Sequence, residues 1–451
     1  MANSEYDTIV AIATPPGKGG VGIIRISGKL SSNIALSLLG CIPALRQATL
    51  QRFKDEANSI IDTGLAIFFA APASFTGEDV LELQGHGGPV VMDLLIKRIL
   101  QLGARLAEPG EFSRRAFLND KLDLVQAEAI ADLISAESAQ SARAAMRSMQ
   151  GEFSQRLHDL TEAVINARMH VEAAIDFPDE ELDLMQDQVL IQRLRHALTL
   201  CTEIQQQAQS GSALREGLNV VIAGKPNAGK SSILNCLAGY EAAIVTDVPG
   251  TTRDVLRERI LIDGMPVHIL DTAGLRETSD RVEAEGIKRA HQEIRKADHV
   301  LYVVDASNYD AQQLSTSLST LPKKVGATVL MNKCDLIDAM SQQYNSEQHF
   351  ALFVSASKNL GIDELRQHLK QIAGFSNTES GLFLARRRHL DALQRARDHL
   401  QQAQDSLMNK QAGELCAEEL RLAQQQLSEI TGEFSSDDLL GRIFSTFCIG
   451  K

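Results

Sequence analysis

Residues 219–232 read Asn-Val-Val-Ile-Ala-Gly-Lys-Pro-Asn-Ala-Gly-Lys-Ser-Ser, and this stretch decides the fold of the chain around it. Its apolar residues 220–223 predict a buried strand. The strand runs into the pattern Gly-x-x-x-x-Gly-Lys-Ser, from Gly224 to Ser231, and a helix is expected to start at Ser232. A strand, a glycine-rich loop and a helix in this order form a phosphate-binding loop.

The residues of this loop suit phosphate binding. Glycines let backbone N–H groups turn toward the phosphates, and the dipole of the following helix adds positive potential. Lys230 is expected to reach the β- and γ-phosphates of a nucleotide, and the Ser231 hydroxyl is expected to ligate Mg²⁺. The loop residues expected to contact the nucleotide are Asn227, Ala228, Gly229, Lys230, Ser231 and Ser232.

Two later stretches extend the nucleotide site. Asp271-Thr272-Ala273-Gly274 follows a second predicted strand, and Asn332-Lys333-Cys334-Asp335 follows a third. The Asp335 carboxylate can accept hydrogen bonds from both N1–H and the exocyclic amine of guanine, whereas adenine offers no such pair of donors. This order of elements is typical of a GTPase, so we predict a Ras-like P-loop GTPase domain that binds GTP. A strand at residues 350–354 leads into the last expected base-binding residues, Ser355, Ala356 and Ser357.

The composition is that of an ordinary folded protein with several domains. The chain has 451 residues, 44% hydrophobic and 23% charged, enough for two or three separate cores. Its net charge of −13 argues against nonspecific nucleic-acid binding over a large surface, but leaves a local basic surface open. Six cysteines show neither metal-binding spacing nor a disulfide framework. With no signal peptide and no bilayer-spanning apolar run, we expect a cytoplasmic protein without a membrane segment.

The expected secondary structure divides the chain into four segments. The first mixes short strands with a helix, which predicts an independent α/β domain. The second and fourth are helical, and the third holds the GTPase elements. We therefore predict a GTPase domain inserted into a helical domain whose two parts pack as one bundle. Irregular apolar spacing argues against the alternative, a coiled-coil arm. The segments are residues 1–118, 119–215, 216–376 and 377–451.

Apolar residues recur at three- and four-residue spacing in the helical parts. One stripe covers residues 122–134 and another covers residues 146–175, which predicts two long helices. A third helix, at residues 189–209, is expected to lead through a flexible Ser210-Gly211-Ser212 into the GTPase domain. Arg386-Arg387-Arg388 is a candidate RNA-binding surface, with a plain solvated helix start as the alternative.

Gly85-His86-Gly87-Gly88 directly follows a predicted strand at residues 80–83. Its glycines could let a ligand approach the backbone closely, or they could make a tight turn into the helix expected at residues 89–102. The residues alone leave both explanations open.

The identity of the residue that orients the attacking water is also undetermined by the sequence. Small GTPases place a Gln directly after Asp-x-x-Gly, but here that position is Leu275, whose side chain cannot hold a water molecule. A polar residue in the following segment must act instead. The candidates are Arg276, Glu277, Asp280, Arg281, Glu283 and Glu285.

A second loop, at residues 245–254, is rich in Thr and Gly and supplies many oxygen atoms. One of its threonines is expected to ligate Mg²⁺ beside Ser231. Arg253 could act as an arginine finger, or a monovalent cation could supply the same positive charge. Asn227 could be a ligand of that cation or a plain cap of the phosphate loop. The residues of the second loop expected at the nucleotide are Thr246, Asp247, Val248, Pro249, Gly250, Thr251 and Thr252.

Seven stretches spread over the whole chain resemble the MnmE (TrmE) family of bacterial tRNA modification GTPases. The first is Ala-Thr-Pro-Pro-Gly-Lys-Gly-Gly-Val-Gly-Ile at residues 13–23, and the last is the uncommon ending Cys448-Ile449-Gly450-Lys451. The others are residues 75–79, 85–88, 108–112, 117–123 and 250–254.

The resemblance implies an N-terminal folate-binding domain that also forms a homodimer, and a central helical domain with an inserted GTPase. It implies a complex, a heterotetramer or larger, with the flavoprotein MnmG (GidA), which brings FAD and NADH. Together such proteins add an aminomethyl or carboxymethylaminomethyl group to C5 of the wobble uridine of certain tRNAs. The one-carbon unit comes from 5-formyl- or methylene-tetrahydrofolate.

The same resemblance implies the remaining site residues. The positions that match the family's folate contacts are Arg25, Glu82, Lys121 and Lys451. The positions that match its K⁺ ligands are Asn227, Thr246, Val248 and Thr251, and those that match its Mg²⁺ ligands are Ser231 and Thr252. Glu283 matches the glutamate that helps to position the attacking water in the family. By analogy, the resemblance therefore selects Glu283 from the candidates above.

Two roles are open for Cys448. A lone terminal cysteine is most often inert, but beside the tail motif we expect a nucleophile or proton donor near the folate or the uridine. One position departs from other GTPases, because Ser357 stands where many have Lys. A different function is also open: an RNA-binding switch would use the same GTPase domain, but it would need neither a folate site nor Cys448.

Overall fold

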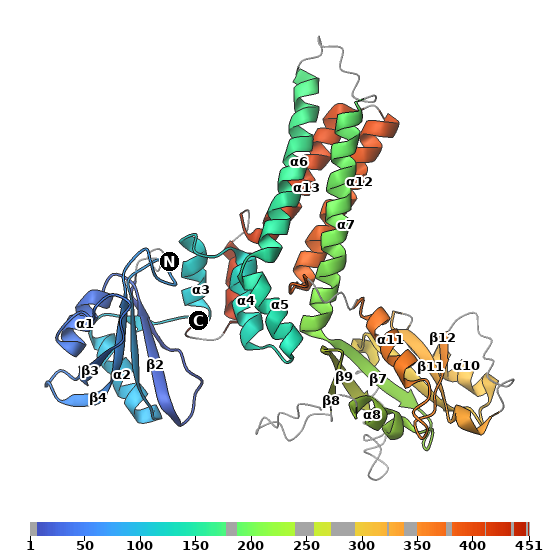
Figure 1. Cartoon of the computed structure of the whole chain (residues 1–451), viewed down its shortest axis with the longest axis horizontal. Coiled ribbons are helices and arrows are strands. Elements are labelled where there is room, and N and C mark those ends of the chain that lie inside the picture. Colours follow the sequence, from blue (N-terminus) through green and yellow to red (C-terminus); the bar gives the residue numbers. More distant parts are fainter. Residues whose placement is uncertain are drawn as a thin grey trace. The chain divides into compact units, whose positions relative to one another are not determined.

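The computed structural model describes residues 7–176, 187–239, 257–271, 294–322, 324–337, 350–375, 381–410, 412–433, 437–447 and 450. The chain divides into two compact units, one of residues 1–131, 148–193 and 402–451 and the other of residues 132–147 and 194–401. Each unit has its own β-sheet (Figure 1) and its own apolar core. The predicted combination of α/β parts with long helices is confirmed. In the described part of the chain, no helix combines the length and hydrophobicity of a membrane span.

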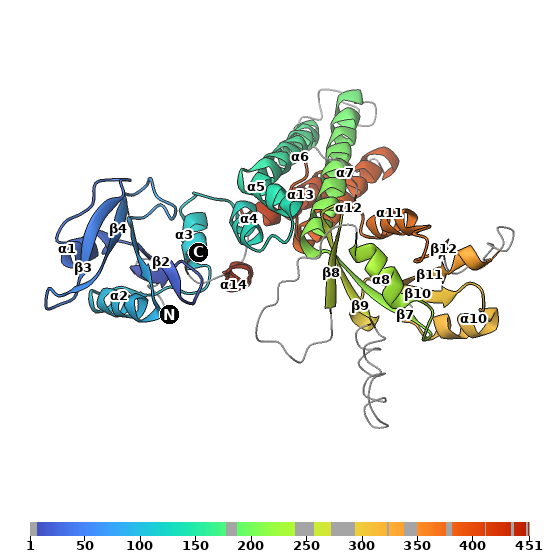
Figure 2. The same ribbon diagram turned by 60° about the horizontal axis from the view of Figure 1, so that its bottom comes forward.

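The first unit contains a six-stranded sheet with the order β3-β4-β5-β2-β1-β6, in which only β1 and β6 run parallel. Helices α1 (Ser31–Leu39) and α2 (Pro89–Gln101) cover one face of it (Figure 2). Successive side chains of a strand alternate between faces, so Ile24 and Ile26 are buried under these helices and Arg25 lies on the other face. The strands are β1 (Ile9–Ile12), β2 (Gly19–Ser27), β3 (Thr49–Lys54), β4 (Ile60–Phe69), β5 (Val80–Gly87) and β6 (Arg105–Leu106).

Two strands of this sheet are longer than the sequence predicts. β2 begins at Gly19 and β5 continues through Gly87, and these two glycines pair with each other. A Cβ atom on Gly87 would lie 2.8 Å from the Gly19 carbonyl oxygen, so a larger residue could not pair this closely. The tight turn considered for residues 85–88 is therefore wrong, because residues 85–87 are part of β5, and close pairing with the opposite strand explains Gly87.

Helices from before and after the GTPase segment pack together in the first unit. α6 (Glu152–Asp176) lies along α13 (Gly413–Thr431), and their buried apolar residues face each other. The Arg168 guanidinium on α6 donates to the Gln424 side chain on α13 at 2.7 Å. This packing is what the insertion of the GTPase domain into a helical domain predicts.

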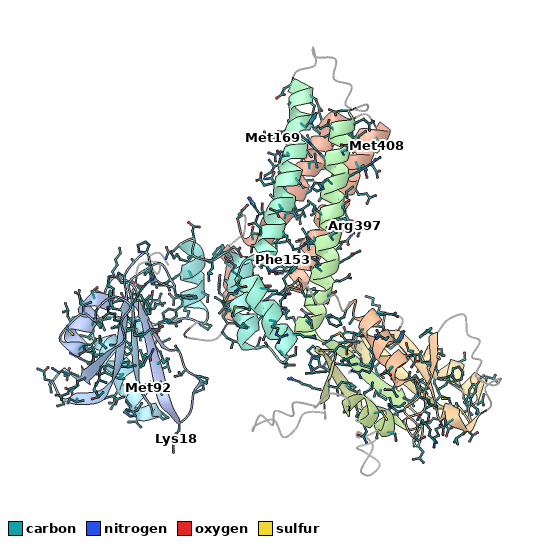
Figure 3. All side chains as sticks on the ribbon, viewed as in Figure 1. Lys18, Met92, Phe153, Met169, Arg397 and Met408 are labelled. Atoms are coloured by element: carbon teal, nitrogen blue, oxygen red, sulfur yellow. The ribbon has the colours of Figure 1, made fainter. Side chains whose placement is uncertain are left out.

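The long helix predicted over residues 146–175 is wrong, because the structure has two helices there. Gly151, at φ +91°, separates α5 (Ala139–Met149) from α6. On α6, Phe153 is fully buried, whereas Met169 is 58% exposed (Figure 3). The apolar stripe continues across the break, which is why periodicity alone could not locate it.

The last residues of the chain return to the N-terminal sheet. α14 (Asp437–Ser445) packs against α3 (Glu111–Leu118), which begins after Gly110. A Cβ atom on Gly110 would lie 2.5 Å from the Phe444 carbonyl oxygen, so glycine permits this approach. Gly450 lies against the end of β1 in the same first unit.

The sheet of the second unit has the order β12-β11-β10-β7-β9-β8. All neighbouring strands run parallel except β8 and β9, which form the predicted hairpin at Asp263 and Gly264, with φ angles of +49° and +80°. The strands are β7 (Leu218–Gly224), β8 (Arg257–Ile262), β9 (Met265–Asp271), β10 (His299–Asp305), β11 (Gly326–Asn332) and β12 (Phe350–Phe353). The short helices are α8 (Lys230–Ala238), α10 (Ala311–Ser319), η4 (Cys334–Leu336) and α11 (Ile362–Ile372).

The flexible link predicted at residues 210–212 is wrong. α7 (Gln188–Glu216) continues through these residues almost to β7, and Ser210 is 1% exposed. Gly211 faces the Phe383 backbone so closely that a Cβ atom would clash with its carbonyl oxygen. The small residues of this stretch therefore allow close packing rather than flexibility.

Residues 132–147 belong to the GTPase-containing unit, although the sequence analysis assigned them to the first part of the helical domain. Ala144 and Ala145 share a core with Ile260 and Met265 of the β8–β9 hairpin.

A buried carboxylate joins three segments of the second unit. Asp132, 6% exposed, accepts from Arg215 at the end of α7 at 2.9 Å, and from Arg386, directly before α12 (Arg387–Lys410), at 2.8 Å. Arg386 is thus engaged inside the unit, which weakens residues 386–388 as a candidate RNA surface.

Candidate functional sites

The strands that precede the phosphate loop, Asp271 and the two base loops all end at one edge of the second sheet. Strands β7, β9, β10, β11 and β12 run parallel, so their carboxyl ends share that edge, where ligands of open α/β sheets bind. The phosphate loop follows the central strand β7, and Asp271, at the end of β9, pairs in register with Ile222 of β7. The two predicted base loops follow β11 and β12.

The backbone of the phosphate loop needs its glycines. Gly224 has φ +139° and a Cβ atom there would clash with the Val303 carbonyl oxygen, while Gly229, at φ +93°, caps helix α8. The helix begins at Lys230, two residues earlier than predicted, so Ser231 is in its first turn and is exposed. The structure thus presents a helix N-terminus and a hydroxyl at the loop, as anion and Mg²⁺ binding require.

The Lys230 ammonium is folded across its own loop. The side chain is 7% exposed, and Nζ donates to the carbonyl oxygens of Gly224 at 3.1 Å and Lys225 at 2.8 Å. A phosphate group is an anion and would bind this ammonium more strongly than neutral carbonyl oxygens do. Lys230 is therefore already located where a nucleotide phosphate would meet it.

Asn332 connects the phosphate loop to the base-binding loop. Its Nδ2 donates to the Ala228 carbonyl oxygen at 2.8 Å, and its Oδ1 accepts from the Ala356 backbone N–H at 3.3 Å. Ser355 closes the base loop by two backbone hydrogen bonds with Leu360. Asp335 is exposed on η4, so its carboxylate is accessible to a base. All the predicted base-loop residues thus lie together.

Sequence reasoning missed Asp305, which anchors Lys333. The Lys333 ammonium lies 2.5 Å from the Asp305 carboxylate, and Ser307 also donates to it. Burial opposes the charge, but the hydrogen bonds from Lys333 and Ser307 outweigh it and lower the pKa of Asp305. Asp305 ends β10 at the same sheet edge, a position that could have revealed it.

Several predicted site residues lie outside the described residues. These are Thr246, Asp247, Val248, Pro249, Gly250, Thr251, Thr252, Thr272, Ala273, Gly274, Glu283, Cys448 and Lys451, together with the alternatives Arg253, Leu275, Arg276, Glu277, Asp280, Arg281 and Glu285.

A second site lies on the sheet of the first unit, around Arg25. Its guanidinium pairs with the Glu82 carboxylate, at 2.9 Å from Nε and 2.8 Å from Nη2. It also lies over the rings of Phe75 and Phe112, at 5.7 and 5.8 Å from their centroids, within cation–π range. Phe112 is fully buried, so the rings hold the guanidinium in place, and the partly exposed Arg25–Glu82 pair can offer hydrogen bonds to a polar heteroaromatic ligand. The two rings were not predicted, although both lie in stretches that carry the family resemblance.

Of the other predicted members of this site, Lys121 is described and Lys451 lies outside the described residues. The Gly450 carbonyl oxygen lies 3.5 Å from Nη1 of Arg25, which brings the C-terminal tail to the site. Lys121 is exposed, and its aliphatic chain lies near Gly77, two residues from Phe75.

Comparison with known proteins covers the whole chain. Residues 124–448 match the model of the MnmE helical domain, and residues 8–121 match that of the GTP-binding protein TrmE N-terminus. The tRNA modification GTPase MnmE of Proteus mirabilis (strain HI4320) is 58% identical over 450 residues, which are 99% of each chain. The protein of the same name from Yersinia pestis bv. Antiqua (strain Angola) is 58% identical over 453 residues, 99% of this chain and 100% of that one.

Solved structures resemble the chain over a smaller part. The G domain of the FeoB iron transporter of T. maritima is 27% identical, with a TM-score of 0.27, over 35% of this chain and 98% of that one. Aquifex aeolicus Era bound to GDP·AlF4⁻ is 25% identical, with a TM-score of 0.28, over 40% of this chain and 66% of that one. The full-length identity to curated relatives and the two family models lead to one conclusion: the chain belongs to the MnmE family of tRNA modification GTPases.

Proposed function

We propose that the chain uses K⁺-dependent GTP hydrolysis to drive modification of C5 of the wobble uridine in certain tRNAs. The flavoprotein MnmG (GidA), carrying FAD and using NADH, would be its partner. The group added is aminomethyl or carboxymethylaminomethyl, and a tetrahydrofolate supplies the one-carbon unit. The observation that carries this proposal is a separate site at Arg25, with the C-terminal tail beside it, in a chain that also has a GTP site.

The described residues at the phosphate loop fit the two metal ions. Ser231 offers an exposed hydroxyl in the first turn of α8, a suitable ligand for Mg²⁺. Asn227 is exposed, so its amide oxygen is accessible to K⁺. A bound K⁺ would supply the charge that an arginine finger supplies elsewhere. Thr246, Val248, Thr251 and Thr252 complete the proposed ligands.

The exposed face of the N-terminal sheet supports the proposed homodimer. Leu50 on β3 is 72% exposed, and its cross-strand neighbour Leu65 on β4 is 38% exposed. Both lie on the face opposite α1 and α2, where a second copy would cover them.

A tRNA substrate also implies a cytoplasmic location.

Binding of 5-formyl-tetrahydrofolate is expected to depend on the pair at the second site. Arg25→Met and Glu82→Gln should each weaken it by at least about 10-fold, because each removes a charge-assisted hydrogen-bonding partner. Isothermal titration of the full-length protein measures this change. Arg52→Met, which alters an exposed arginine on strand β3 of the same sheet, is the matched control. If all three variants bind 5-formyl-tetrahydrofolate with the wild-type affinity, the proposed folate site at Arg25 is refuted.

Loss of the chain is expected to abolish the C5-modified wobble uridine, as measured by nucleoside mass spectrometry of cellular tRNA. Complementation with the wild type should restore it, and Cys448→Ser should not, because we propose that Cys448 acts near the folate or the uridine. Cys41→Ser, at an exposed free cysteine, is the control and should behave as the wild type. Restoration by Cys448→Ser would make Cys448 inert. If the modified uridine is still present in the deletion strain, the result would instead support the alternative function, an RNA-binding switch.

A further inference from the structure

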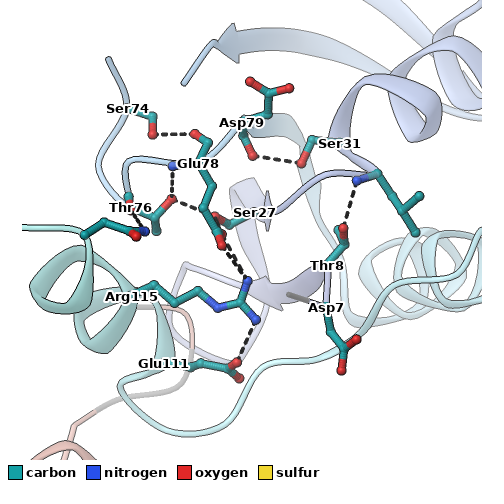
Figure 4. A network of polar contacts seen from close by, with 12 residues as sticks. Asp7, Thr8, Ser27, Ser31, Ser74, Thr76, Glu78, Asp79, Glu111 and Arg115 are labelled. Carbon is teal, nitrogen blue, oxygen red and sulfur yellow. Dashed lines mark hydrogen bonds and ion pairs between the residues drawn. The ribbon is translucent and has the colours of Figure 1, made fainter. Parts of the chain in front are cut away.

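Arg115 on helix α3 is held between two glutamates (Figure 4). Its Nη1 donates to both carboxylate oxygens of Glu78, at 3.0 and 3.1 Å, and its Nη2 donates to Glu111 at 2.9 Å. Arg115 is 5% exposed and Glu111 is 7% exposed. An ion pair this well buried and this fully hydrogen-bonded fixes the geometry of the elements that carry it.

Glu78 belongs to the loop between β4 and β5, and this loop is fastened at more than one point. The Ser27 hydroxyl donates to Glu78 at 2.6 Å and shares a hydrogen bond of 2.7 Å with Thr76. The Asn119 amide donates to the Thr76 carbonyl oxygen at 2.7 Å. The loop is therefore bound both to strand β2, through Ser27, and to the end of α3.

The two aromatic rings below Arg25 come from the two elements that this ion pair joins. Phe75 is in the loop, three residues before Glu78, and Phe112 is on α3, three residues before Arg115. Arg25 itself is two residues before Ser27 on β2. One guanidinium thus ties together the loop, the helix and, through Ser27, the strand that form the Arg25 site.

Glu111 has a second cationic partner that plays no part in this connection. Arg105, on β6, donates to its carboxylate at 2.6 and 2.9 Å and also lies 3.5 Å from the Asp7 carboxylate. Burial opposes ionisation of Glu111, yet the hydrogen bonds from Arg105, Glu108 and Arg115 outweigh it and lower the pKa of Glu111. Arg105 therefore offers a matched control, since its loss removes one partner of Glu111 and leaves the Arg115–Glu78 pair intact.

We infer that Arg115 is a positioning residue of the Arg25 site: it fixes the loop that carries Phe75 and the helix that carries Phe112, the two rings against which the Arg25 guanidinium lies, and so holds that guanidinium in place for a bicyclic heteroaromatic ring such as a pterin. A guanidinium is suited to this role because its planar fork directs Nη1 to Glu78 and Nη2 to Glu111, which fixes orientation as well as distance. The identity of the ligand rests on the proposed folate function, whereas the positioning of the loop does not.

The chain contains no tryptophan, which gives a clean reporter of the loop. Phe75→Trp places a single indole in it, and emission wavelength and acrylamide quenching then report how the loop packs. Affinity for 5-formyl-tetrahydrofolate is measured separately, in the full-length protein with Phe75 retained. The substitutions to compare are Arg115→Met, Arg115→Lys, the pair Arg115→Met with Glu78→Gln, and the control Arg105→Met.

Arg115→Met is expected to weaken folate binding at least about 10-fold and to shift the Trp emission to longer wavelength, with stronger quenching. Arg115→Lys keeps the charge without the planar fork and should remain impaired. The paired substitution leaves no bare carboxylate at residue 78, so it retains the expected effect even if Arg115→Met alone unfolds. Arg105→Met should stay within about 3-fold of the wild type in affinity, with unchanged emission.

Wild-type affinity and unchanged emission in both Arg115→Met and the paired variant would overturn the inference and leave the folate proposal intact. Failure of the wild-type protein to bind folate would instead refute the folate proposal. The emission of the Phe75→Trp series would then decide alone whether Arg115 positions the loop. GTP hydrolysis should be unchanged in every variant, because all the changes are outside the GTPase-containing unit.

Discussion

Glu283→Ala is expected to slow GTP hydrolysis by about 10²-fold or more while leaving GTP affinity nearly unchanged, since a positioned acid–base group contributes on this scale. The reason is the apolar Leu275 at the position that usually orients the attacking water. Another group must hold that water, and we propose Glu283. Such a group acts on the transition state and does not contribute to ground-state binding of the nucleotide.

Single-turnover hydrolysis and nucleotide titration separate these two effects for Glu283. Glu285→Ala is the matched control, because it removes an equal charge two residues away in the same segment. It should keep wild-type turnover. A wild-type rate in Glu283→Ala with a slow Glu285→Ala would transfer the role to Glu285, and loss of GTP affinity in Glu283→Ala would make the residue structural.

Hydrolysis is also expected to be at least about 10-fold faster in K⁺ than in Na⁺ at equal ionic strength, because a correctly placed cation stabilises charge that develops between the β- and γ-phosphates. Asn227 is the described residue on which this expectation depends, since it is exposed in the phosphate loop. Na⁺ is smaller and would fit a site built for K⁺ less well. Turnover at saturating GTP and Mg²⁺ measures the difference.

Asn227→Ala tests the assignment of the cation site. It should lower the hydrolysis rate in K⁺ and leave the slow rate in Na⁺ almost unchanged, so that the rates in the two salts become similar. Rb⁺, which is close to K⁺ in size, should support hydrolysis in the wild type. Equal wild-type rates in K⁺ and Na⁺ would refute the cation proposal and return Arg253 to consideration as the source of the charge.

The nucleotide site was predictable because its determinants are local. The phosphate loop is a short segment that begins at Gly224 and ends at Gly229 and Lys230, where helix α8 starts. Its backbone conformation is therefore set by residues that are close in sequence. The base loops were found in the same way, because each follows a strand whose apolar run marks it in the sequence. Their convergence followed from the rule that parallel strands share their carboxyl edge.

Small residues misled the sequence analysis in two places for one physical reason. Gly87 was considered for a tight turn or a ligand contact, and Gly211 was expected in a flexible link, but each permits a close backbone approach inside a regular element. A glycine allows both unusual dihedral angles and close packing, and its neighbours in sequence do not reveal which one is used. Only the partner across the gap, Gly19 or Phe383, decides.

The sequence by itself determined the GTPase domain, its guanine specificity, its insertion between helical segments and the family, because motifs and apolar periodicity are contiguous properties of the chain. Tertiary structure decided which distant groups meet. It placed Gly450 beside Arg25, separated by 425 positions, and joined Phe75 to Phe112 through Glu78 and Arg115. Such contacts depend on strand register and on which segments pack together, and no spacing rule within one helix or strand carries that information.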